Sequence, residues 1–92
     1  MPSFKAVVIP GDRRGDGTYN VKIRVLHNRG QRRIPTSLDA RPSDLTRSLK
    51  IKNPDILSRC DEIIVQMRAA IADINPFDLE DMTVAELVSH IR

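Results

Sequence analysis

The sequence predicts an α+β fold: a three-stranded antiparallel sheet packed on one long C-terminal helix, plus a short truncated second helix. Three observations predict it. Residues 19–27 alternate apolar and polar side chains, which is the period of a half-buried strand. A turn signal, Asn28-Arg29-Gly30, separates them from another strand-like stretch. Residues 56–74 then repeat apolar side chains at helical spacing.

Three stretches are expected to form the strands. Residues 4–9 are a short β-type run that ends at Pro10-Gly11. Residues 19–27 form the second strand, and Gly30 is expected to supply a positive φ in the turn that follows. Residues 32–38 form the third strand. Pro35 within it lacks an N–H, which favours an edge position or a local irregularity.

The long helix is predicted to begin at Asn53-Pro54-Asp55. Asn53 can cap it, Pro54 suits the first helical position, and Asp55 complements the helix dipole. Asn75-Pro76 is expected to end it. Its apolar stripe comprises Ile56, Cys60, Ile63, Met67, Ile71 and Ile74, widened by Leu57 and Ile64. Packing this stripe on the sheet covers one sheet face, made by Val21, Ile23, Val25 and Ile34.

A second helix is predicted to begin at Thr83. Thr83 and Glu86 have the spacing of a capping box, and Met82 and Leu87 have that of a hydrophobic staple. The sequence stops at Ile91-Arg92 without a C-cap signal, so we expect a fragment of a longer protein. Arg41-Pro42-Ser43-Asp44-Leu45, between sheet and helix, predicts a turn or one loose helical turn.

Charge is distributed unevenly along the chain. Residues 1–52 carry twelve Lys or Arg and four Asp, a balance of +8, whereas residues 53–92 carry three Arg and eight acids, a balance of −5. This asymmetry favours a half that faces a polyanion. The single cysteine excludes an internal disulfide, and no apolar run approaches the ~18 residues of a membrane span. We therefore expect a soluble protein of the cytoplasm, with no membrane partner.

No catalytic or metal-binding motif is present in the sequence. His27 and His90 have no ligand spacing, and each is expected at the surface or beside a turn. Cys60 falls in the apolar stripe and is expected in the core, and Tyr19 is expected at the core edge. The sequence therefore predicts no enzyme activity, no cofactor, no metal site and no small-molecule substrate.

The uncovered sheet face predicts binding to double-stranded DNA, whose major groove admits a β-ribbon. We expect loop cations to contact phosphates while the sheet faces the bases. Only three aromatic residues occur, none on the presumed outer face, which argues against stacking on single strands. The expected face residues are Asn20, Lys22, Arg24 and Arg33, and the flanking loop cations are Arg13, Arg14, Arg29 and Arg32.

The segments DGTYNVKIRVLHNRGQRRIPTSL and DLTRSLKIKNPDIL resemble the amino-terminal arm-binding domain of tyrosine recombinases, the phage-type integrases of mobile elements. The resemblance covers about residues 4–75 and includes no catalytic signature. It implies a sheet that enters the major groove of arm-type sites, with strand cleavage in a separate carboxy-terminal domain. It implies groove-facing positions at Asn20, Lys22, Arg24 and Arg33, with Arg32 replacing Arg33 if Pro35 shifts the register.

The resemblance also implies a domain organisation and a setting. Residues 1–75 correspond to the arm-type DNA-binding domain, and residues 76–92 to a linker and the start of the core-binding helical domain. The implied partners are duplex DNA, in a nucleoid-associated setting, and other recombinase protomers. Two alternatives stay open: a protein-interaction module that uses an edge strand or a helix, and a basic face that serves only solubility.

Overall fold

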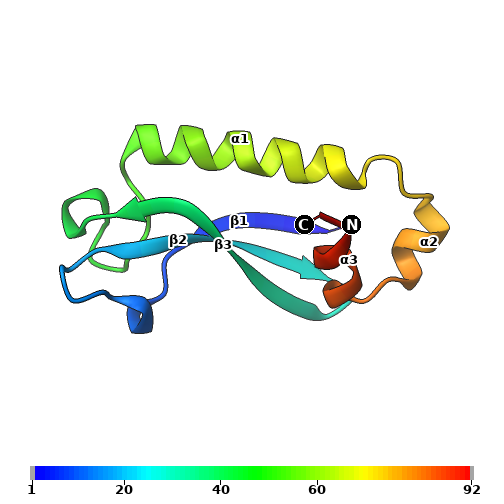
Figure 1. Cartoon of the computed structure of the whole chain (residues 1–92), viewed down its shortest axis with the longest axis horizontal. Helices are drawn as coiled ribbons and strands as arrows, with labels where there is room; N and C mark the ends of the chain where they lie inside the picture. Colours follow the sequence, from blue (N-terminus) through cyan, green and yellow to red (C-terminus); the bar gives the residue numbers. More distant parts are fainter. Residues whose placement is uncertain (1, 92) are drawn as a thin grey trace.

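The computed structural model describes residues 2–91 as one sheet covered by helices (Figure 1). Its extents of 43 × 23 × 19 Å make the molecule elongated. The elements are β1 (Ser3–Val7), η1 (Pro10–Asp12), β2 (Tyr19–His27), β3 (Gly30–Ala40), η2 (Pro42–Asp44), α1 (Pro54–Ile71), α2 (Pro76–Asp81) and α3 (Val84–Ile91).

The sheet is the antiparallel meander that the sequence predicts, in the order β1-β2-β3. The second strand has the predicted bounds, and the third is longer than predicted at both ends. Both β1 and β3 are edge strands, so Pro35 does lie at an edge. The predicted α+β class is therefore confirmed.

Helix α1 lies along one face of the sheet (Figure 1). Asn53 caps it by accepting hydrogen bonds from the backbone N–H groups of Asp55 and Ile56. Cys60, Met67 and Ile71 are buried in a core shared with the sheet, where Val21, Ile23 and Val25 are fully buried. Leu57, predicted to widen the stripe, is instead 39% exposed. The predicted apolar stripe therefore does form the core contact of the helix. The buried part of the stripe is narrower than predicted, because Leu57 lies outside it.

The turn between β2 and β3 differs from the prediction at Gly30. The positive φ values belong to Asn28 (46°) and Arg29 (66°), as in a two-residue hairpin loop of type I′. Gly30 is needed for another reason: a Cβ built there would lie 2.5 Å from Cγ1 of Val84 in α3. The missing side chain lets a helix approach the hairpin closely.

The end of the long helix also differs from the prediction. Helix α1 ends at Ile71, and Ala72 is its C-cap. Asn75-Pro76 does not simply stop a helix but starts another, because Asn75 accepts a hydrogen bond from the backbone N–H of Phe77. The acidic residues Asp78, Glu80 and Asp81 therefore lie on the short helix α2.

Helix α3 begins with the predicted capping box. The Thr83 N–H donates to Oε1 of Glu86 at 3.1 Å, and the Glu86 N–H donates to Oγ1 of Thr83 at 3.2 Å. Val84 is buried and Leu87 is 0% exposed within the same core as β2. The segment 76–91, which the resemblance assigns to a linker and the start of a following domain, packs on the sheet here.

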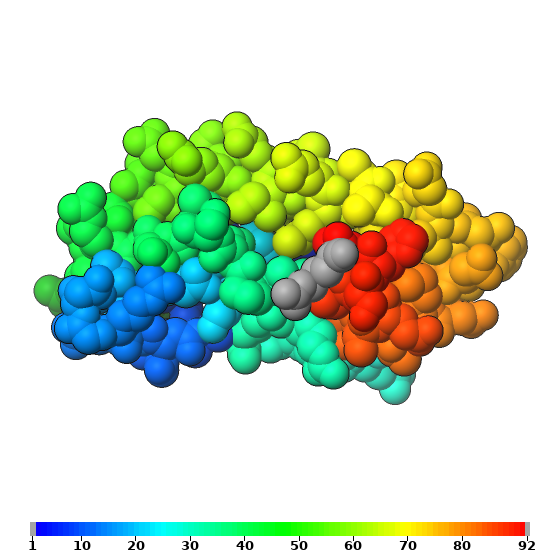
Figure 2. Space-filling model, in the orientation of Figure 1, coloured from blue at the N-terminus to red at the C-terminus, as the bar shows by residue number. Residues whose placement is uncertain are grey.

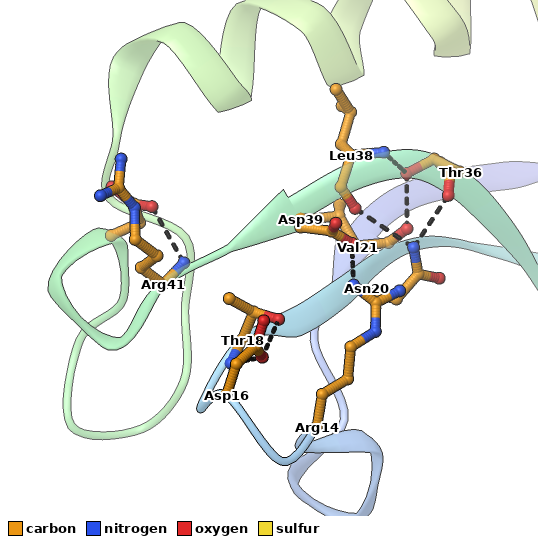
Figure 3. A network of polar contacts seen from close by, with 10 residues as sticks. Arg14, Asp16, Thr18, Asn20, Val21, Thr36, Leu38, Asp39 and Arg41 are labelled. Carbon is orange, nitrogen blue, oxygen red and sulfur yellow. Dashed lines mark hydrogen bonds and ion pairs between the residues drawn. The ribbon is translucent and has the colours of Figure 1, made fainter.

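The sheet has one irregularity, between Asn20 and Lys22 of β2. Asn20 pairs with Asp39, but Lys22 pairs with Pro35, so β3 holds two extra residues there. The side chains of Asn20 and Thr36 fill the gap in the ladder (Figure 3). Pro35, which has no N–H to donate, lies where the register shifts, as predicted.

Among the helices that the structure describes, none has both the length and the apolar character that crossing a membrane requires.

Candidate nucleic-acid interface

The sheet face opposite α1 carries the candidate interface. Buried Ile23 and Val25 point toward the helices, so alternation places Lys22 and Arg24 on the other face. The strand register puts Arg24 opposite Lys5 of β1 and opposite Arg33 of β3. Three cations from three strands therefore form one row, which we call the cation row: Lys5, Arg24 and Arg33.

The register decides between Arg32 and Arg33. Arg33 pairs with Arg24 and so shares the helix-free face, whereas Arg32 pairs with Val25 and lies on the helix side. Arg32 is exposed and makes only a 3.4 Å contact, from Nη1 to its neighbour's carbonyl at Gln31. The alternative in which Arg32 replaces Arg33 does not occur, because the register shift lies beyond Pro35.

The cation row has no acidic partner among residues 2–91. The ion pairs formed there are Arg14–Asp39 and Lys22–Asp12. Like charges directly opposite on neighbouring strands repel. Arg24 also holds its Nε buried and without a hydrogen-bond partner, an arrangement that costs free energy unless another group accepts from it. The row is therefore unfavourable in isolation and suited to an anion.

Lys22 differs from the row because Asp12 of η1 pairs with its Nζ. This ion pair holds the 3-10 turn η1 against the sheet face. The contact lies at the end of the sheet away from the β2–β3 hairpin turn. The negative charge of Asp12 partly cancels the attraction of Lys22 for an anionic ligand, which is not the case for Arg24 or Arg33. Lys22 is on the predicted face, but it is not a free cation in this structure.

Asn20 is committed to the sheet itself. Its Nδ2 donates to the Thr36 carbonyl at 2.8 Å and to the Leu38 carbonyl at 3.2 Å (Figure 3). A bidentate contact to adenine needs the amide to donate as well as accept. Since both amide hydrogens are used within β3, Asn20 lies on the predicted face but is not free to make such a contact in this geometry.

The loop cations fall into two kinds. Arg14 pairs with Asp39 at 2.6 Å across the mouth of the loop between β1 and β2 (Figure 3). Arg13 and Arg29 are exposed and take part in none of the ion pairs within residues 2–91. In the same loop, hydrogen bonds from the Thr18 hydroxyl and N–H lower the pKa of Asp16. Arg13 and Arg29 are thus the loop cations free to contact phosphate.

Lys5 is the face residue that the sequence alone did not identify. Lys5 lies in a short apolar run, and the sequence does not show which residue of a neighbouring strand it pairs with. Only the register, in which Lys5 faces Arg24, places it on this surface. Cross-strand neighbours are a product of pairing, so a single strand pattern carries no signal for them.

The remaining chemically active side chains serve the core. Cys60 is 1% exposed, and its burial, with the charge of Asp61, raises the pKa of its thiol. His27 is beside the turn as expected but 5% exposed, and its Nε2 donates to the Leu79 carbonyl at 2.8 Å. Tyr19 packs at the core edge. Within residues 2–91 no group of His, Cys, Asp or Glu could hold a metal ion.

The chain was compared with protein-family models, curated proteins and solved structures, and no match was found in any of the three.

Proposed function

We propose that this domain binds double-stranded DNA through the helix-free face of its sheet. The observation that carries the proposal is the in-register cation row, which within residues 2–91 has no acidic partner and includes a buried Arg24 Nε without a hydrogen-bond acceptor. Phosphates or guanine O6 and N7 would accept hydrogen bonds from such groups. Neighbouring strands lie about 4.8 Å apart, so the row spans about 10 Å, comparable to the roughly 12 Å major groove.

The wider setting that we propose is arm-site recognition by a tyrosine recombinase. The support is the resemblance of residues 4–75, together with a three-stranded sheet backed by a helix. In that setting the domain itself has no catalytic role, and cleavage belongs to another part of the parent protein. Arg13 and Arg29 would anchor phosphates at the two ends of the sheet face.

The test is a titration of fluorescent duplex DNA by fluorescence anisotropy at several salt concentrations. If four to six phosphates are neutralised, log K should fall with log salt at a slope of roughly −4 to −5. Lys5→Ala, Arg24→Ala and Arg33→Ala should each weaken binding about fivefold or more and, where a phosphate contact is lost, reduce the slope by about one. Lys22→Ala should have a smaller effect because Asp12 already pairs with it.

The matched control is Arg59→Ala. Arg59 is an exposed arginine on α1, which lies on the opposite face of the sheet. Its loss changes net charge by the same amount but should leave affinity nearly unchanged. Equal losses for Arg59→Ala and Arg33→Ala would mean that total charge, not the sheet face, drives binding. No binding at low salt would leave the basic face with a solubility role only.

A protein-interaction module is the second candidate, favoured by the long open edge of β3. Residues Gly30–Ala40 pair only with β2, so their outer backbone groups could accept a partner strand. Backbone pairing involves no phosphate, so such binding should depend little on salt. The salt slope therefore separates the two candidates.

A further inference from the structure

A second surface lies at the end of the molecule formed by α2 (orange in Figures 1 and 2). Phe77, on this helix, is 78% exposed, the most exposed large hydrophobic side chain among the described residues. Its neighbours one helical turn on, at i+3 and i+4, are Glu80 and Asp81. The surface is thus an aromatic side chain flanked by acids.

Beside this aromatic lies an apolar groove of about 290 Å³. It runs between the start of β1, the end of α1 and the start of α2, and Pro76, the neighbour of Phe77, forms part of its wall. The groove is lined mainly by Phe4, Ile71, Ile74 and Leu79, and its one charged lining residue is Arg68. The Arg68 guanidinium lies over the Phe4 ring, 5.6 Å from its centroid.

The groove is large enough for the aromatic side chain, and the charges beside the two features are opposite. The groove has room for a phenyl ring, and Arg68 matches Glu80 or Asp81 of the acidic surround. None of these three residues belongs to an ion pair within residues 2–91. Because both features lie at one end of the same chain, two copies related by a twofold axis could each insert Phe77 into the other's groove.

We propose that this end of the domain is a self-association surface, occupied by a second copy of the same chain. Phe77 is the anchor, and Arg68 facing Glu80 or Asp81 of the other copy fixes the orientation. The contact is small, so the dimer should form at about 0.1–1 mM protein. It leaves the cation row free, and it does not depend on whether that row binds DNA.

The test is sedimentation equilibrium of the whole 92-residue chain up to about 2 mM, comparing Phe77→Ser with Val65→Ser. Val65 is the matched control, since it is 64% exposed on α1 and outside the groove. Phe77→Ser should weaken dimerisation at least about tenfold, as expected for an aromatic anchor, and Val65→Ser should not. Wild-type protein that stays monomeric to 2 mM, or equal losses in both variants, would overturn the proposal.

Charge exchange tests the orientation independently of Phe77. Arg68→Glu and Asp81→Arg should each weaken the dimer, and the double variant should regain most of the lost affinity. Glu80→Arg is tested in the same way, alone and combined with Arg68→Glu. In a sample mixing labelled and unlabelled chains, isotope-filtered NOEs should join the Phe77 ring to Ile71 or Ile74 methyls of the other copy. Dimers without these NOEs and without charge rescue would contradict the proposed contact.

Discussion

Arg24 combines two properties that rarely coexist in a residue kept for stability. Its Nε is buried without a hydrogen-bond partner, and its neighbours across both strands are cations, Lys5 and Arg33. An unsatisfied buried donor costs roughly 1–3 kcal/mol, and facing like charges add to the cost. Burial of part of the aliphatic stem offsets some of this cost, since Arg24 is half-buried. These costs are the reason why we propose that an anion contacts this guanidinium.

Arg24→Met separates the two explanations. Methionine keeps an unbranched stem but removes the charge and the unpartnered nitrogen. We expect thermal stability to stay the same or to rise by about 1 kcal/mol, while affinity for duplex DNA falls about fivefold or more. Thermal melts and anisotropy titrations measure the two effects. A variant that melts several degrees lower would show that Arg24 stabilises the free fold.

At the scale of single residues, the sequence predicts which face of the sheet a side chain lies on. It does not predict which side chains or backbone groups that side chain contacts. Lys22, Arg24 and Arg33 lie on the predicted face because alternation alone determines it. The ion pair to Asp12 and the hydrogen bonds of Asn20 depend on how a loop folds back and where β3 shifts register. Those are properties of pairing and loop geometry that local pattern does not contain.

At the scale of elements, strong local signals predict boundaries and mixed signals do not. Alternation gives β2 its bounds, and the capping box of Thr83 and Glu86 gives α3 its start. Asn75-Pro76 is a mixed signal: it suits both the stop of one helix and the cap of the next. Because α2 has only six residues, its periodicity is too short to decide.

The contact between the hairpin and α3 leads to a prediction at Gly30. A Cβ at this position would lie 2.5 Å from Cγ1 and 3.1 Å from Cβ of Val84, so either α3 or the hairpin must move. Gly30→Ala should therefore lower the free energy of unfolding by about 1–3 kcal/mol, as overpacking does. Urea denaturation measures this loss.

Val84→Ala is the partner variant for that measurement. Alone it should destabilise the protein, because Val84 is buried and its loss leaves a cavity. Combined with Gly30→Ala it should cost less than the sum of the two, since each change relieves the other. Additive losses would mean that Gly30 matters for backbone freedom in the turn and not for helix approach.

For the whole molecule, the question is whether residues 76–91 belong to the folded unit. The resemblance places them outside it, yet several contacts bind them to the hairpin. Asn28 donates from Nδ2 to the Glu80 carbonyl at 2.6 Å and to the Met82 carbonyl at 2.7 Å, and His27 donates to Leu79. Leu87 is fully buried in the core. Hydrogen bonds and core packing therefore hold the C-terminal segment against the hairpin, while Asn28 and Arg29 at its tip stay exposed.

A chain ending at residue 75 tests this. Removing α2 and α3 withdraws Val84 and Leu87 from the core, and each buried aliphatic side chain contributes about 1.5–3 kcal/mol. It also removes the hydrogen bond from His27 Nε2 to the Leu79 carbonyl, which contributes about 0.5–1.5 kcal/mol. Together these losses approach the whole stability of a small domain, about 5 kcal/mol at the low end. We expect the shortened chain to be largely unfolded, with collapsed dispersion in its amide NMR spectrum. A shortened chain that melts cooperatively near the full-length temperature would show that residues 1–75 fold as an independent unit, with 76–91 only resting on its surface.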